Sequence, residues 1–183
     1  MKKEYFAVID TETTWKNTLM TAGVIIAEAG TFKIADRKYF VIPDEVAKGG
    51  IYIDVVHLKD LEEEEVFDDD IGPAIELFLS GYDVSTICAY NAGFDKSYLS
   101  FLEKFTWRDI MGAAAYKQFN PFIPDDAPCC GSGRLKKGYG VEGISQILGK
   151  KGYREIHNAL FDALDELDIM RRLGHPLNVY PEV

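Results

Sequence analysis

A short apolar run near the start of the chain, Tyr5 to Ile9, is followed at once by the carboxylates Asp10 and Glu12. The run has no polar residue on either face, which is typical of a strand buried at the centre of a sheet. Carboxylates rarely lie beside such a strand without a partner, because burying an unpaired charge is costly. The chain must therefore cover this strand on both faces and supply a partner for its acidic end.

The order of the remaining elements predicts the fold class. Residues 22–27 and 32–42 are expected as strands, joined by a connection short enough for a hairpin. Further along, helices are expected over 73–79, 94–105, 141–148 and 160–173 and near Lys117, and strands over 84–90 and 107–110. An antiparallel three-strand meander followed by alternating helices and strands predicts an α/β fold with a mixed sheet flanked by helices. A chain of 183 residues is expected to form one domain, 1–183.

The charge of the chain restricts the classes of partner. A formal net charge of −10 argues against a protein that coats nucleic acid through a broad basic surface. It is compatible with an enzyme that holds a short stretch of backbone through bound cations. The acidic segment from Asp60 to Asp70 is expected to be a solvated loop before a helix. Residues 120–140 are expected to be irregular, as long functional or mobile loops are.

The sequence also predicts the cellular setting. No segment resembles a secretory signal peptide or approaches the ~20 apolar residues of a membrane span, so we expect a cytoplasmic protein without a membrane partner. Cys88 is expected in the core. Cys129 and Cys130 are expected as loop thiols, because a zinc site there would need further ligands nearby.

The first candidate site residues are carboxylates. In an extended backbone Asp10 and Glu12 point to the same face, where they can hold one ion; the alternative is a turn with two surface acids. Asp95 falls on the apolar side of the expected helix 94–105, close in angle to Leu99 and Leu102. Such a charge needs a partner, a metal or a catalytic reason, unless it caps the helix.

The last helix adds a histidine and another carboxylate. His157 precedes the helix, where the positive end of the dipole favours a neutral imidazole that can accept a proton from water. The alternative is a surface histidine, which is how we interpret His57 and His175. Asp162 lies about 160° from Leu160 on a helical wheel, which by itself predicts exposure to solvent. Ile169 shares that side, so the side is not expected to be fully exposed.

Together these segments resemble a known family. Residues 9–14 (IDTETT), 91–95 (NAGFD) and 157–163 (HNALFDA, the pattern H-x-A-x-x-D) resemble, in order, the motifs of the DEDDh 3′–5′ exonucleases. The resemblance covers most of the chain and implies a ribonuclease H-like fold. The family often has glycine after the threonine pair, where this chain has Trp15. This indole either stacks on a terminal base or covers the sheet edge.

The resemblance implies hydrolysis assisted by two Mg²⁺ or Mn²⁺ ions. Asp10, Glu12 and Asp162 would bind the ion that carries the attacking water. Asp10 would bridge to the second ion, with Asp95 acting directly or through water. His157 would deprotonate the water as general base.

The resemblance also implies a substrate, a single-stranded 3′ end of DNA or RNA. Contacts to it are expected from the residues Thr11, Thr13, Trp15 and Asn91. The basic residues before His157 form either a local rim for the backbone or plain solvated surface: Arg134, Lys136, Lys137, Lys150, Lys151 and Arg154. A homodimer and association with a polymerase both stay open. So do two other functions, a catalytically silent nucleic-acid-binding or adaptor module and a phosphoesterase acting on short oligonucleotides.

Overall fold

A six-stranded mixed sheet lies at the centre of the molecule, with the strand order β4-β3-β2-β1-β5-β6. The structure is a computed structural model that describes residues 3–183. The strands are β1 (Tyr5–Thr13), β2 (Leu19–Glu28), β3 (Ile34–Val41), β4 (Glu64–Glu65), β5 (Thr86–Ala89) and β6 (Thr106–Asp109). The first three form an antiparallel meander, and β5 and β6 continue the sheet in parallel beyond β1. The predicted mixed α/β fold is therefore confirmed.

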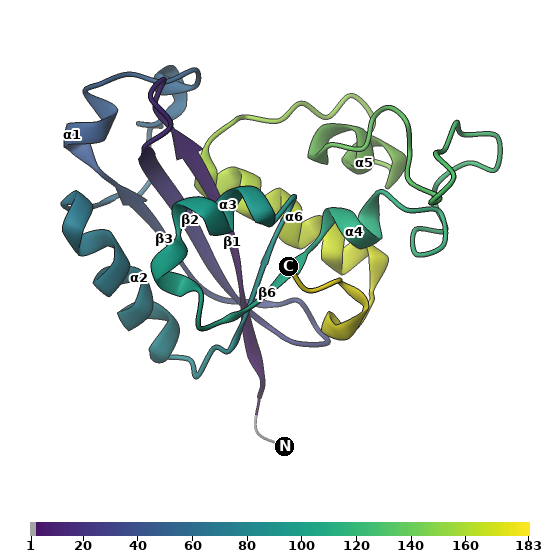
Figure 1. Ribbon diagram of the computed structural model, residues 1–183, viewed down its shortest axis with the longest axis horizontal. Coiled ribbons are helices and arrows are strands. Elements are labelled where there is room, and N and C mark those ends of the chain that lie inside the picture. The colour runs from purple at the N-terminus through teal and green to yellow at the C-terminus, as the bar shows by residue number, and fades with distance from the viewer. Residues whose placement is uncertain (1–2) are drawn as a thin grey trace.

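Helices cover both faces of this sheet (Figure 1). They are α1 (Pro43–Val46), α2 (Ile71–Ser80), α3 (Gly93–Tyr98), α4 (Met111–Ala114), α5 (Val141–Ile147) and α6 (Ala159–Leu173). Short 3₁₀ turns are formed by Ile53–Val55, Asp68–Asp70, Ser100–Leu102 and Leu177–Val179. The long helix α6 lies on one face, and α2 and α3 lie on the other.

Strand β1 is buried on both faces, as its apolar run predicts. Phe6 and Val8 pack into an apolar cluster that includes α5 and α6, whereas Ala7 and Ile9 pack into a second cluster with α2. Side chains alternate along a strand, so Asp10 and Glu12 continue the α6 side. The sequence of β1 therefore directs two carboxylates toward the start of α6.

The close approach of α6 to the sheet depends on Gly23. Gly23 pairs with Asp10 across the β1–β2 ladder. A Cβ atom at position 23 would lie only 2.2 Å from the backbone oxygen of Ala159 and 2.4 Å from the Cα of Leu160. The absent side chain lets the first turn of α6 rest directly on β2, beside the carboxylates of β1.

The predicted helix 94–105 is wrong as a single element. Helix α3 ends at Tyr98, because Leu99 has φ −111° and ψ 41°, and a 3₁₀ turn follows. The break allows Leu99 and Leu102 to pack together in the cluster with α2, and it leaves Phe94 44% exposed instead of on an apolar face. The helix expected near Lys117 is α4, which ends earlier at Ala114.

The two segments expected as loops differ in outcome. Residues 120–140 contain no helix and no strand among the described elements, and Figure 1 shows them projecting beyond α4 and α5. The acidic segment precedes α2 as expected, but its residues Glu64–Glu65 add the edge strand β4 to the sheet, parallel to β3. This pairing with a distant strand leaves no local pattern in the sequence.

Several smaller features follow the sequence. Cys88 is fully buried in β5, and Cys129 and Cys130 lie partly buried in the irregular segment. Within residues 3–183, no helix combines the length and the apolar character that crossing a membrane requires.

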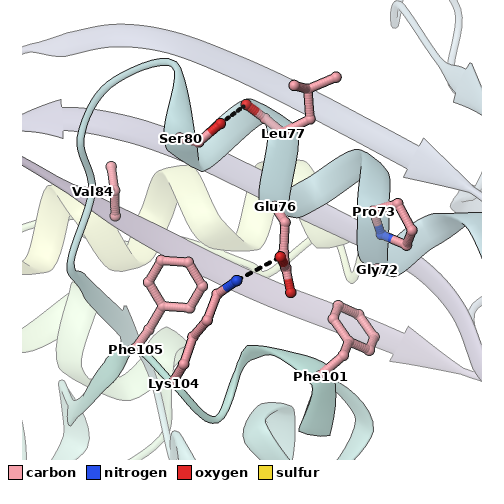
Figure 2. A pocket seen from close by; sticks show the side chains of 9 residues that line it. All are labelled: Gly72, Pro73, Glu76, Leu77, Ser80, Val84, Phe101, Lys104 and Phe105. Atoms are coloured by element: carbon pink, nitrogen blue, oxygen red, sulfur yellow. Dashed lines mark hydrogen bonds and ion pairs between the residues drawn. The ribbon is translucent and has the colours of Figure 1, made fainter.

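A cavity of about 640 Å³ lies between α2 and the segment that leads into β6 (Figure 2). It is lined by Gly72, Pro73, Glu76, Leu77, Ser80, Val84, Phe101, Lys104 and Phe105. Lys104 forms an ion pair with Glu76 at 2.5 Å, so the charged groups at this cavity neutralise each other. None of the predicted site residues lines it, and the candidate site lies instead at the end of β1.

Candidate active site

The predicted site residues converge at the end of β1. Asp10 and Glu12 come from β1, Asp95 from the first turn of α3, and His157 and Asp162 from the start of α6. Segments far apart in the sequence thus meet because β1 carries α6 on one face and α3 at its end. Carboxylates from three elements and one imidazole therefore share a single region of the molecule.

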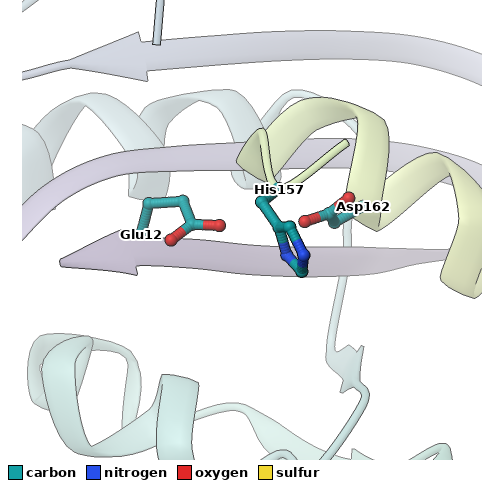
Figure 3. A group of neighbouring side chains, drawn as sticks. All are labelled: Glu12, His157 and Asp162. Atoms are coloured by element: carbon teal, nitrogen blue, oxygen red, sulfur yellow. The ribbon is translucent and has the colours of Figure 1, made fainter. Parts of the chain in front are cut away.

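The closest grouping is that of Glu12, His157 and Asp162. Each offers one ligand atom, and these atoms lie within 4.8 Å of one another. Figure 3 shows the carboxylates of Glu12 and Asp162 directed toward each other across the sheet–helix boundary, with the imidazole beside them. Two oxygens and a nitrogen at this spacing form a donor set that can hold a divalent cation.

Asp10 lies deeper than this group. Its Oδ2 atom is buried without a hydrogen-bond partner among residues 3–183, and so is Oδ1 of Asp162. Burial, followed by the nearby charges of Asp95 and Glu166, holds the pKa of Asp10 well above its usual range. Buried carboxylate oxygens that face no donor are costly to keep, and a cation between them removes that cost.

Asp95 is only 2% exposed, which confirms its predicted burial. Its Oδ1 atom accepts a hydrogen bond of 2.8 Å from the hydroxyl of Thr11, so β1 and α3 are linked inside the site. Burial raises the pKa of Asp95 to about 7, against the opposing effect of the Thr11 hydrogen bond. Thr11 therefore orients a carboxylate, and its predicted contact with a substrate stays a prediction.

Glu12 and Asp162 share an unfavourable electrostatic environment. Burial, and after it the charge of Glu155, raises the pKa of each carboxyl to about 8. Glu155 lies two residues before His157, and burial raises its own pKa too. No Lys or Arg in the described chain forms an ion pair with Glu12 or Asp162. Near neutral pH, protons and cations therefore compete for binding to these carboxylates.

Asn158 holds His157 in place at the start of α6. The Asn158 side-chain oxygen accepts from the backbone amides of Leu160 and Phe161, as an N-cap does. Its amide nitrogen donates to the hydroxyl of Tyr39 at 3.1 Å and to the backbone oxygen of Val55 at 2.8 Å. The buried amide thus joins α6, β3 and the 53–55 turn. His157, the preceding residue, has φ 62°, a left-handed conformation that few non-glycine residues adopt.

The His157 imidazole is suited to accept a proton. Burial lowers its pKa, although the nearby Glu142 has the opposite effect. The lowered pKa favours the neutral ring, which is the protonation state that the sequence predicts from the helix dipole. One face of the ring is covered by Tyr52, which was not among the predicted site residues.

The residues expected to contact a substrate surround this cluster. Trp15 lies just after β1 and is 66% exposed, with its indole ring over Gly49. Asn91 is exposed and has φ 62°, and its backbone amide donates to Asp109 at 2.9 Å. Thr13 is half-buried at the end of β1. The exposed indole at the sheet end is available for stacking, and all these contacts stay predictions.

The expected basic rim is partly engaged within the protein. Lys150 forms ion pairs with Asp165 at 2.8 Å and with Asp168 at 3.0 Å, both on α6. Arg154 pairs with Glu142 at 2.8 Å. Lys136, Lys137 and Lys151 are exposed, and Arg134 lies over the ring of Tyr139. Solvent-facing lysines thus lie in the segment that leads to His157, and their contact with nucleic acid stays a prediction.

Comparison by sequence finds no matching family model and no matching curated protein. Comparison by structure finds 3′-exonucleases. The nuclease domain of 3′hExo, a DEDDh family member bound to rAMP, has a TM-score of 0.64 and 13% identity, over 93% of this chain and 92% of that chain. A 3′-exonuclease that recognises the histone mRNA stem-loop has a TM-score of 0.65 and 14% identity over 94% of this chain, which spans 64% of that protein.

A further similar structure is Escherichia coli exonuclease I in complex with a 5cy-dT13 oligonucleotide. Its TM-score is 0.61 at 14% identity over 94% of this chain, and the chain spans 40% of the length of that protein. Identities this low establish the fold and not the activity. The chain therefore has the ribonuclease H-like fold of the DEDDh exonucleases, as the motif resemblance predicts.

Proposed function

We propose that this protein is a metal-dependent 3′–5′ exonuclease that releases nucleoside 5′-monophosphates from a single-stranded 3′ end of DNA or RNA. The observation that carries the proposal is the group formed by Glu12, His157 and Asp162, whose ligand atoms lie within 4.8 Å of one another. The fold supports it, because similar structures include a nuclease domain bound to rAMP and an exonuclease bound to an oligonucleotide.

The residues present fit a pair of Mg²⁺ or Mn²⁺ ions. These cations prefer oxygen ligands, and Asp10, Glu12, Asp95 and Asp162 would hold them. The oxygens of Asp10 and Asp162 that lack any hydrogen bond are the specific sign of this fit. When bound, such ions neutralise the charge on the phosphodiester and lower the pKa of the attacking water.

Other side chains would accept a proton, orient the site residues and position the substrate. The neutral His157 imidazole accepts the proton of the attacking water as general base. Tyr52 covers one face of that ring and so restricts its orientation. Thr11 fixes Asp95 through the 2.8 Å hydrogen bond. The exposed indole of Trp15 stacks on a terminal base, which positions the 3′ nucleotide.

The direct test uses a single-stranded oligonucleotide labelled at its 5′ end. With Mg²⁺ a ladder of shortened products is expected, and EDTA should abolish it. Asp10→Asn should reduce the rate by at least about 100-fold. Substitution of a group that only supports a metal ligand already costs about 10- to 100-fold, and Asp10 would be a ligand itself. Asp125→Asn is the matched control, because Asp125 is exposed in the irregular segment away from β1. Equal ladders from both variants would show a different site or a contaminant.

Substrate geometry decides the direction and the substrate class. The 5′-labelled strand should shorten one nucleotide at a time, whereas immediate release of labelled mononucleotide would reveal a 5′ exonuclease. Cleavage of a circular strand would reveal an endonuclease and contradict the proposal. Rates on DNA and RNA of increasing length then separate an exonuclease from a phosphoesterase restricted to short oligonucleotides.

A further inference from the structure

Glu166 is a buried carboxylate that the proposed mechanism does not use. It lies on α6 four residues after Asp162, so both side chains project from the same face of the helix. The residue is 1% exposed. Its Oε2 atom has no hydrogen-bond partner in the described part of the chain.

The surroundings of Glu166 belong to the candidate site. Val8 pairs with Cys88 in the parallel β1–β5 ladder, so Tyr90 lies near the level of Asp10. Glu166 interacts with the backbone amide of Tyr90. Its charge also contributes to the raised pKa of the Cys88 thiol on β5. Glu166 on α6 therefore lies within electrostatic range of Asp10, Asp95 and Asp162.

Negative groups face Glu166 from several elements. Burial, followed by the charges of Asp95 and Asp162, holds the pKa of Glu166 well above its usual range, and Glu155 adds to the effect. Asp10 in turn is affected by Glu166. Within residues 3–183 no Lys or Arg forms an ion pair with Glu166. A glutamate that only filled space here would be replaced at lower cost by an uncharged residue of the same size.

We propose that Glu166 is an additional carboxylate ligand of the metal site, acting with Asp10 and Asp95. The inference rests on the proposed function, since it requires that the carboxylate cluster binds divalent cations. Asp10, Asp162 and Glu166 each have a buried carboxylate oxygen without a hydrogen-bond partner among residues 3–183, and a divalent cation is a partner that would satisfy such oxygens. The extra charge should tighten cation binding and make the metal-free site more unfavourable.

The experiment titrates Mn²⁺ alone into the full chain by calorimetry and measures melting temperature in EDTA. Glu166→Gln keeps the shape of the side chain but removes its charge. We expect Mn²⁺ to bind about 10- to 100-fold more weakly, as for changes around other metal ligands. In EDTA at alkaline pH, where the carboxyls of the cluster lose their protons, the variant should melt at a higher temperature, because a repelling carboxylate has been removed. Glu76→Gln on α2, which carries the same change away from the site, should leave Mn²⁺ binding unchanged.

A second variant guards against a folding defect. Glu166→Met fills a similar volume without a polar group, and it should match Glu166→Gln in weak Mn²⁺ binding and in raised stability in EDTA. Unchanged Mn²⁺ affinity in both variants would overturn the inference and leave the proposed function standing. Lower stability of both in EDTA would show that Glu166 serves the fold instead. Failure of the unsubstituted protein to bind Mn²⁺ at all would overturn the proposed function itself.

Discussion

The imidazole of His157 stacks on the ring of Tyr52, with the ring centroids 4.0 Å apart and the ring planes inclined by 12°. Tyr52 immediately precedes the 3₁₀ turn Ile53–Val55, which is bound to α6 through Asn158. The stacking partner of the proposed base is thus attached to the same helix start as the base itself. A base held on one face keeps its reactive nitrogen directed toward the carboxylates.

Tyr52→Ala should impair the base without abolishing metal binding. Stacking of this kind contributes about 0.5–1.5 kcal/mol, so we expect a loss of up to about 10-fold in kcat. Removing the ring also exposes the imidazole, so the lowered pKa of His157 should rise and the acidic limb of the pH–rate profile should move to higher pH. Steady-state rates from pH 5 to pH 9 measure both effects.

Matched variants complete this comparison. Tyr52→Phe keeps the ring and should behave as the unsubstituted protein. His157→Ala should lower kcat by about 10²- to 10⁴-fold, the range for general bases. His57→Ala should not, because His57 pairs with Glu63 on the surface. An unshifted pH profile in Tyr52→Ala would show that the stack does not tune the base.

Gly23→Ala should damage the site by displacing the start of α6. Its methyl group would collide with the backbone of Ala159 and Leu160, which cannot move without shifting α6. We expect a loss of about 1–3 kcal/mol in the free energy of unfolding, as in overpacked cores. The exonuclease rate should fall by more than the fraction of unfolded protein explains, because α6 carries Asp162. Urea denaturation and exonuclease rates test this, with Gly131→Ala as control in open space. Full activity in the destabilised variant would contradict it.

Much of the fold is predictable from local patterns, and the errors arise from packing between distant elements. The apolar run of β1 identifies a central strand, because no side of it suits water. The break at Leu99 is not visible locally, since the apolar spacing of 94–105 continues through it. In the structure Leu99 and Leu102 pack into the cluster with α2, a contact with a distant element that the local spacing does not predict. The edge strand β4 likewise depends on a partner strand far away in the sequence.

In the candidate site, too, some features are predictable from local patterns and others depend on packing between distant elements. The burial of Asp95 agrees with its predicted position among apolar residues, although the helix assumed for that prediction ends at Tyr98. The burial of Asp162 is not, because a wheel centred on Leu160 places it on the opposite side. The buried face of α6 is centred instead on small or flexible residues such as Ala163 and Met170, which suit the close approach at Gly23. Glu166 lies on this face too, but a glutamate in a charged helix normally indicates a solvent-exposed position.

Asn158→Ala should destabilise the start of α6. The substitution removes the cap acceptor and leaves the carbonyl of Val55 and the hydroxyl of Tyr39 without their donor. Loss of a cap costs about 1 kcal/mol, and each buried group without a partner adds to this, so we expect about 2–4 kcal/mol in unfolding free energy. Asn158→Asp retains the acceptor and loses only the donors, so it separates the two contributions. A loss below about 0.5 kcal/mol in Asn158→Ala would show that the helix start is held by other contacts.

The metal-free protein should lose stability as pH rises, and Mn²⁺ should reverse this. The pKa of Asp95 is raised to about 7 and those of Glu12 and Asp162 to about 8, whereas unfolded carboxyls titrate near pH 4. Between these limits the folded state binds more protons than the unfolded state, so unfolding free energy falls by about 1.4 kcal/mol per pH unit for each proton held.

Divalent cations compete with those protons, so the stabilisation by Mn²⁺ should increase over the same pH range. Melting temperatures in EDTA and in Mn²⁺, recorded from pH 5.5 to pH 9, should therefore diverge as pH increases. The double variant Glu12→Gln/Asp162→Asn should flatten the curve in EDTA, because it removes two of the groups whose pKa is raised. Parallel curves with and without Mn²⁺ in the unsubstituted protein would show that these carboxyls do not bind the cation.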